Sequence, residues 1–144
     1  MKYYALDQLQ SVAEVNQGYP AMSRRERLER WAEVLERNPH RLLSTLHQTE
    51  HQLASARAAM RADNSPISVA YYDTALRAAG LAGDSYGDAQ LFFDLSDREL
   101  HEVICYCHFG STVSSAAAAH CVRSLLVEKR PGLFARIRNI FARG

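Results

Sequence analysis

Three histidines and three cysteines lie between residues 96 and 129, and five of these side chains are candidates to bind a metal or act as nucleophiles. They are His101, Cys105, His108, His120 and Cys121. Imidazole nitrogen and thiolate sulfur are the ligands that zinc prefers in tetrahedral protein sites. The sequence therefore contains a candidate zinc site, with His101, Cys105 and His120 as its main ligands and His108 or Cys121 as the fourth group.

A helical hairpin over about 96–129 is expected to position these residues. Ser96 and Glu99 have the spacing of a capping box, which predicts the start of the first helix. Gly110 predicts its end, and Ser111 or Thr112 can cap the second helix. The second helix contains a run of four alanines, 116–119, which lets another helix approach closely.

Antiparallel packing of these helices about Gly110 would place His101 near His120, and Cys105 near Ala116. Cys105 also lies between two histidines, as an activated thiol would, but its position late in a helix does not favour a low thiol pKa. Helical cysteine and histidine are also often ordinary packing residues. We therefore expect no cofactor and favour a protein that is not an enzyme, with zinc as the alternative.

A second metal-like pattern lies nearer the amino end. His47, Glu50 and His51 form H-x-x-E-H, the string of the inverted zinc-protease motif. Asn38-Pro39 resembles a helix start, and a helix carrying three leucines from position 42 would continue into this string. The motif is short and no third ligand can be placed, so a solvated helix face is the preferred interpretation.

The whole chain is predicted to be all-α, a compact bundle of about six to seven short helices centred on the antiparallel hairpin. Glycine (7) and proline (4) are sparse among the 144 residues. Ser23 and Glu26 form another capping box, which opens a helix to Arg37. Ser65-Pro66 opens a helix that continues to Ala79. We divide the chain into an N-terminal arm or extra helix (1–21), a helical core domain (22–130) and a basic amphipathic C-terminal helix or tail (131–144).

Composition excludes several classes of protein. The formal net charge is +1, and glutamates interleave with the arginines of the helix at 23–37, so the charge distribution does not favour nucleic-acid binding. Three cysteines do not suggest a disulfide scaffold, and no apolar run approaches the roughly 20 residues that span a bilayer. These features favour a cytoplasmic protein.

The C-terminal tail combines an apolar face with arginines. The residues concerned are Leu133, Phe134, Arg136, Ile137, Arg138, Ile140 and Phe141. Such a segment can dock on its own domain, contact a second copy or lie on an anionic membrane. Docking or dimer contact is favoured over peripheral membrane contact, because the segment is too short for a strong anchor.

We therefore predict a small helical protein that works as a protein–protein interaction or regulatory module. Its partner would be another protein or a second copy of the chain, contacted by the helix Ala116–Leu126 and by the tail. The competing hypothesis is a metal- or thiol-dependent protein that uses the histidines and cysteines of the hairpin.

Overall fold

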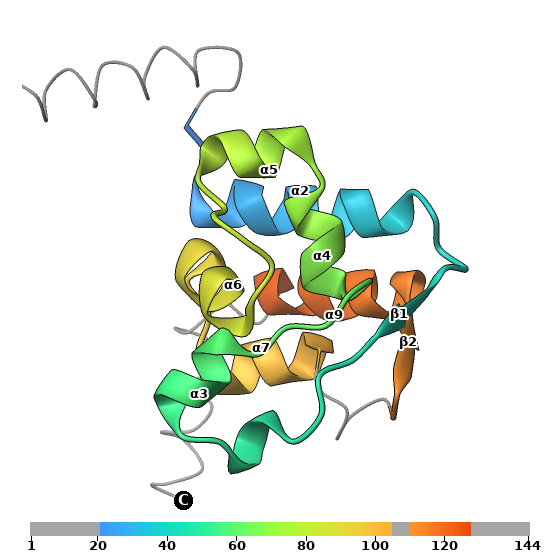
Figure 1. The fold of residues 1–144 in the computed structure, drawn as a ribbon. Helices are drawn as coiled ribbons and strands as arrows, with labels where there is room; N and C mark the ends of the chain where they lie inside the picture. Colours follow the sequence, from blue (N-terminus) through green and yellow to red (C-terminus); the bar gives the residue numbers. More distant parts are fainter. Residues whose placement is uncertain (1–20, 105–109, 128–144) are drawn as a thin grey trace, which may run out of the picture.

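Two helices from opposite ends of the sequence pack together at the centre of the fold (Figure 1). They are α2 (Arg24–Glu36) and α9 (Ser115–Val127). The computed structural model describes residues 21–104 and 110–127 of the chain. Helices from the middle of the sequence lie around this pair, and a short two-stranded ribbon lies at one edge.

The start of α2 is fixed by the capping box that the sequence predicts. The amide of Glu26 donates to Ser23 Oγ at 3.2 Å, and the amide of Ser23 donates to Glu26 Oε1 at 2.8 Å. Both donors would otherwise lack an intrahelical partner. The buried face of α2 consists of Leu28, Trp31, Ala32 and Leu35.

The alanine-rich face of α9 is used inside the fold. Ala118 and Ala119 are buried, together with Val122 and Leu125. Because alanine keeps the two backbones close, α9 can lie against α2, and Ser115 Oγ donates to the carbonyl of Leu35 at 2.6 Å. The predicted partner helix, α7 (Asp97–Ile104), also packs on α9, but α2 is the main partner.

The prediction of a helix after Asn38-Pro39 is wrong. Residues Leu42–Ser44 form strand β1, which pairs antiparallel with β2 (Thr112–Ser114), and Leu43 lies opposite Val113. The second helix of the hairpin therefore begins at Ser115 and not directly after Thr112. Local spacing misled the prediction because each strand is stabilised by a partner far away in the sequence.

The single helix predicted from Pro66 to Ala79 is two helices, α4 (Pro66–Tyr71) and α5 (Thr74–Ala79). Tyr72 ends the first, and Asp73 caps the second, because its carboxylate accepts a hydrogen bond from the amide of Leu76 at 3.0 Å. Aspartate favours the cap position over the helix interior. The break places a charged side chain beside α2.

The remaining elements close one side of the core. They are the 3₁₀ helix η2 (Thr49–His51), α3 (Ala54–Ala59) and α6 (Tyr86–Phe93). The ring of Phe93 stacks on Trp31 with centroids 4.3 Å apart. A Cβ atom on Gly87 would lie 2.8 Å from the Cβ of Ala58, so glycine allows α6 to approach α3 this closely.

The predicted fold class is confirmed. Seven α-helices and one two-stranded sheet make up the regular structure of the described residues, apart from η2. None of the helices in that part of the chain is long and apolar enough to cross a membrane. Residues 1–20 of the predicted N-terminal arm (1–21) and the whole of the predicted C-terminal segment (131–144) lie outside the described ranges, as do residues 128–130.

Candidate functional site: an arginine pocket

His101, the first of the predicted ligands, belongs to a polar cluster between α7, η2 and α6. Its Nε2 lies 2.5 Å from Thr49 Oγ1, and its ring lies against Tyr86. Burial lowers the pKa of His101 below its ordinary value of 6.5; the charges of Asp97 and Glu50 oppose this shift without cancelling it. The neutral imidazole that results is suited to the bond with the buried hydroxyl.

This shift predicts a measurable pH dependence of folding stability. Because the unfolded chain protonates His101 near pH 6.5 and the folded chain only at lower pH, the contribution of His101 is complete above that pH and is lost as pH falls. We expect the urea midpoint of His101→Gln to change less than that of the parent chain between about pH 7.5 and 5.5. The exposed His51 supplies the control variant, His51→Gln, whose urea midpoint should change with pH as that of the parent chain does. An equal change of the midpoint with pH in the parent chain and in His101→Gln would contradict the prediction.

The other two described ligand candidates have different neighbours. His120 is exposed and lines a shallow hollow with Arg123, Ser124 and Val127. Cys121 is a free, half-buried thiol that packs against the core. Burial raises the pKa of Cys121, and the charge of Glu102 raises it further. This thiol is therefore protonated at neutral pH and poorly suited to nucleophilic attack.

Among residues 21–104 and 110–127, no group of three or more His, Cys, Asp or Glu side chains is arranged to hold a metal ion. Cys105 and His108 lie outside these ranges, so the zinc hypothesis that uses them stays a prediction. The tail residues from Leu133 to Phe141 also lie outside these ranges, so their role in binding stays a prediction.

The H-x-x-E-H string does not lie on one helix. His47 precedes η2, and Gln48 adopts a positive φ of 58° between the two histidines. His47 and His51 therefore do not lie on one face of a helix, as the protease motif requires. Both histidines are exposed, in keeping with a solvated segment.

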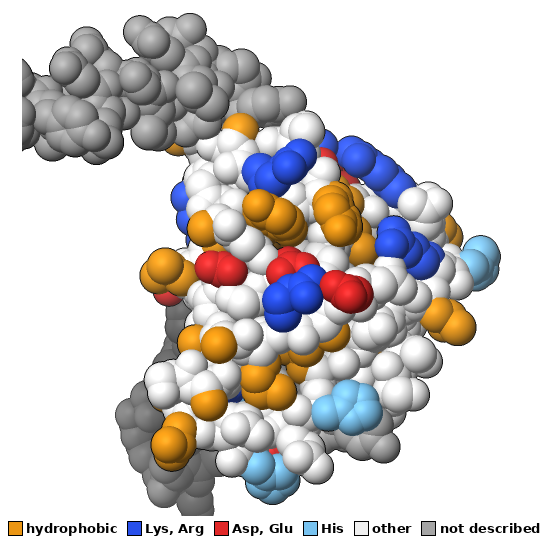
Figure 2. Space-filling model, viewed as in Figure 1, with side chains coloured by type: hydrophobic (Ala, Val, Ile, Leu, Met, Phe, Trp, Pro, Cys, Tyr) orange, Lys and Arg blue, Asp and Glu red, His pale blue; other side chains and the backbone are white. Residues whose placement is uncertain are grey.

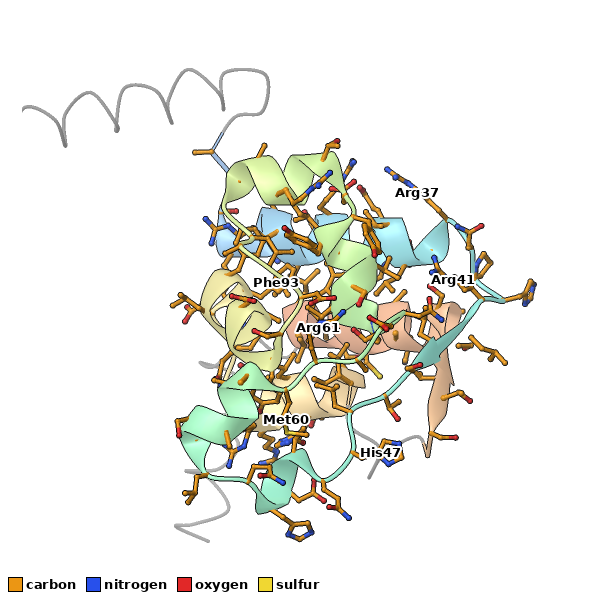
Figure 3. The ribbon with its side chains drawn as sticks, viewed as in Figure 1. Arg37, Arg41, His47, Met60, Arg61 and Phe93 are labelled. Atoms are coloured by element: carbon orange, nitrogen blue, oxygen red, sulfur yellow. The ribbon has the colours of Figure 1, made fainter. Side chains whose placement is uncertain are left out.

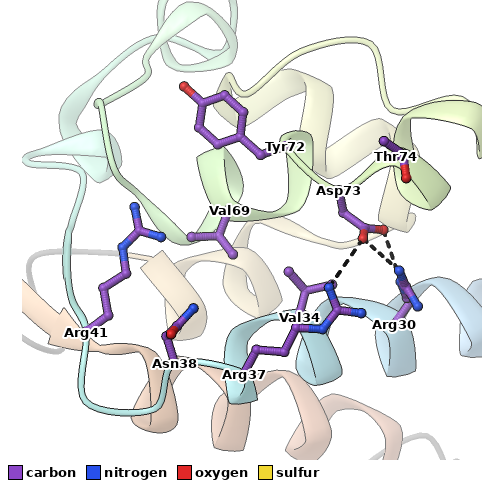
Figure 4. Close-up of a pocket in the computed structure, with 9 residues that line it drawn as sticks. All are labelled: Arg30, Val34, Arg37, Asn38, Arg41, Val69, Tyr72, Asp73 and Thr74. Carbon is purple, nitrogen blue, oxygen red and sulfur yellow. Dashed lines mark hydrogen bonds and ion pairs between the residues drawn. The ribbon is translucent and has the colours of Figure 1, made fainter.

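A pocket of about 370 Å³ lies elsewhere, between the end of α2 and the junction of α4 and α5 (Figure 4). We call it the arginine pocket. It is lined by Arg30, Val34, Arg37, Asn38, Arg41, Val69, Tyr72, Asp73 and Thr74. Figure 3 shows Arg37 and Arg41 at the same corner of the molecule, near the turn that follows α2.

One carboxylate organises the inner wall of the arginine pocket. Asp73 accepts hydrogen bonds from Arg30 Nε at 3.0 Å and Arg30 Nη2 at 2.8 Å, while Arg37 Nη1 lies 3.9 Å from the same carboxylate. Burial alone would raise the pKa of Asp73, but Arg30, the Leu76 amide and Arg37 outweigh it, so the pKa lies below 3.8. Asp73 is therefore a stable anion that holds Arg30 in place.

Arg37 and Arg41, in the outer wall, interact less strongly with acidic groups than Arg30 does. The side chain of Arg37 is 56% exposed, and its distance to Asp73 makes a weak ion pair. Arg41 donates to the side-chain oxygen of Asn64, a neutral acceptor, and forms no ion pair with another described residue. The two guanidinium groups thus face the pocket with donors and charge to offer a ligand.

Apolar surface borders these arginines. Val34 and Val69 line the pocket, and Tyr72 stands at its rim with 72% of its surface exposed. Figure 2 shows basic side chains beside hydrophobic ones in this region, with acidic side chains close by. Three arginines and one carboxylate line the pocket, so it carries a net positive charge and can bind an anionic group next to an apolar one.

Sequence reasoning missed the arginine pocket because its residues come from separate segments, 30–41 and 69–74. One signal was available. An aspartate in the middle of the predicted helix 66–79 is better suited to a cap than to a helix interior, and a break at Asp73 would have exposed a carboxylate to the arginines of α2. Nothing local identifies α2 as the helix beside it.

The chain was also compared with known proteins. The comparisons with protein-family models, with curated proteins and with solved structures found no match for this chain. The functional argument therefore depends on the geometry of the chain itself.

Proposed function

We propose that this protein is a small binding module, acting in the cytoplasm, that contacts a protein partner through the arginine pocket. The observation that carries the proposal is the placement of Arg37 and Arg41 beside the exposed ring of Tyr72. Arginine and tyrosine are the residue types that most often dominate the binding energy of protein interfaces.

The mixture of surface types supports a protein partner over nucleic acid. Asp73 lies in the wall of the pocket, and Glu36, the last residue of α2, comes directly before Arg37 and pairs with Arg123. The exposed Asp63 precedes Asn64, which accepts a hydrogen bond from Arg41, and it pairs with Arg61. A phosphate backbone needs a continuous basic surface, whereas a protein partner can match a small basic patch with an apolar border.

Photocrosslinking in the cells that produce the protein tests the proposal. The crosslinking amino acid benzoylphenylalanine would replace Tyr72 in the full chain, and in a separate control it would replace Leu91, which is 85% exposed and outside the pocket. We expect a discrete protein adduct from position 72 and not from position 91. The adduct should disappear when Arg37→Glu and Arg41→Glu are added, because the charge of the pocket is reversed.

The identity of the adduct defines the kind of module. A different protein supports a hetero-interaction, and a second copy of this chain supports the homo-oligomeric form of the same proposal. No adduct at position 72, or equal adducts at positions 72 and 91, would contradict the proposed role of the arginine pocket.

A further inference from the structure

Resting on the proposed function, we infer that the arginine pocket binds a carboxylate next to an apolar side chain, presented by an acidic segment of the partner protein. The carboxylate would be held by Arg37 and Arg41, since a guanidinium group can donate two parallel hydrogen bonds to a carboxylate. The apolar side chain would lie on Val34 and Val69 below Tyr72.

The different partners of the three arginines support a carboxylate site. Arg30 is held by Asp73 through two hydrogen bonds, so it forms part of the wall. Arg37 is 3.9 Å from a carboxylate that already accepts from Arg30, and Arg41 contacts a neutral amide. An incoming carboxylate can therefore replace the long contact of Arg37 and the neutral acceptor of Arg41 without breaking the pair of Arg30 and Asp73.

An extended segment fits better than a small isolated ion. Arg37, Asn38 and Arg41 also line an adjoining hollow of about 510 Å³ with Pro39 and His40. The two hollows share these three residues, so a ligand can pass from one to the other across the turn at 37–41. The apolar lining on one side gives a neighbouring side chain a place to bind, which a bare anion would not use.

The apolar border separates a carboxylate carried by a protein from a free phosphate ion. Asp73 lies in the wall of the pocket and is paired with Arg30, which leaves Arg37 and Arg41 for the carboxylate of a ligand. Val34 and Val69 give an apolar neighbour of that carboxylate a surface to bind, and a phosphate ion has no such group. We therefore assign the site to an aspartate or glutamate of the partner protein.

Fluorescence anisotropy with labelled peptides tests this inference on the full-length protein. The reference peptide has blocked ends and a single Glu-Leu pair among neutral residues. We expect a Glu→Gln peptide to bind about tenfold more weakly, because a charged hydrogen-bonding partner is lost. A Leu→Ser peptide should also bind more weakly. A free C-terminal carboxylate that restores binding of the Glu→Gln peptide would identify a chain end as the source.

Matched variants of the protein separate the pocket from overall charge. Arg37→Gln with Arg41→Gln should weaken binding of the reference peptide by about tenfold or more. Arg25→Gln with Arg98→Gln removes the same charge from side chains that are 68% and 91% exposed and should leave binding unchanged. Circular dichroism would verify that both double variants are folded.

Three results would overturn the inference: equal losses in the two double variants, no dependence on the glutamate of the peptide, or no dependence on its leucine. These failures are distinct from failure of the proposed function. A partner that crosslinks at position 72 while the carboxylate peptides do not bind would leave the interaction module standing and reject the carboxylate chemistry.

Discussion

Replacing Trp31 with alanine should lower the free energy of unfolding by about 3–5 kcal/mol. Trp31 is fully buried, stacks on Phe93 and donates from Nε1 to the carbonyl of Pro66 at 2.9 Å. The substitution leaves a cavity at the contact of α2, α4 and α6, and it also removes the indole hydrogen bond to the carbonyl of Pro66. Urea unfolding followed by circular dichroism would measure the loss.

Trp31→Phe keeps a ring against Phe93 but removes the indole N–H. We expect it to cost less than the alanine variant, with about 0.5–1.5 kcal/mol attributable to the lost hydrogen bond to the carbonyl of Pro66. Leu91→Ala is the matched surface control and should change stability by less than about 0.5 kcal/mol. Equal stability of Trp31→Ala and Leu91→Ala would contradict the central role of this ring.

Replacing Asp73 with alanine is expected to lower the free energy of unfolding by about 2–4 kcal/mol. The variant removes the cap of α5 and the anionic partner of Arg30 together. The Asp73 side chain is 4% exposed and Arg30 is 29% exposed, so solvent compensates only in part for the lost pair. Thermal and urea unfolding near neutral pH would measure the effect.

Asp73→Asn separates the two roles of this side chain. Asparagine caps helices about as well as aspartate does, so this variant should recover the capping part of the loss but not the charge pair. It should also strengthen binding of the carboxylate peptide, because it removes a negative charge from the wall of the arginine pocket. Asp63→Asn, in a side chain that is 91% exposed, is the control and should change stability by less than about 0.5 kcal/mol. Weaker peptide binding in Asp73→Asn would contradict the electrostatic argument.

Much of the fold could be predicted from local signals. Ser23 and Ser65 begin helices as the sequence indicates, since caps depend on neighbours within a few residues. The segment at 42–46 could not be predicted in the same way. Its leucines have helical spacing, but Leu43 is fixed by a partner strand at Val113, far away in the sequence. Pairing at that distance leaves no local trace.

The candidate site was harder to predict than the fold. The sequence drew attention to histidines and cysteines because those residue types are rare and reactive, and the structure gives His101 and His120 separate surroundings. Arginines such as Arg37 and Arg41 are ordinary surface residues in a sequence. They line a pocket because the chain turns at Asn38, after α2, and because the helix break at Asp73 lies beside this part of α2.

The turn that carries Arg41 also has a consequence for synthesis of the chain. The first amides of α9 complete this turn: Ser115 donates to the carbonyl of Arg41 at 2.8 Å, and Ala116 donates to that of Pro39 at 3.0 Å. Ser115 also bonds to Leu35, 80 positions earlier in the sequence. A growing chain on the ribosome therefore cannot complete the turn until residue 116 has emerged, long after the arginines themselves. The proposed binding surface is therefore complete only once residue 116 is available, and a nascent chain that ends before this residue does not present it.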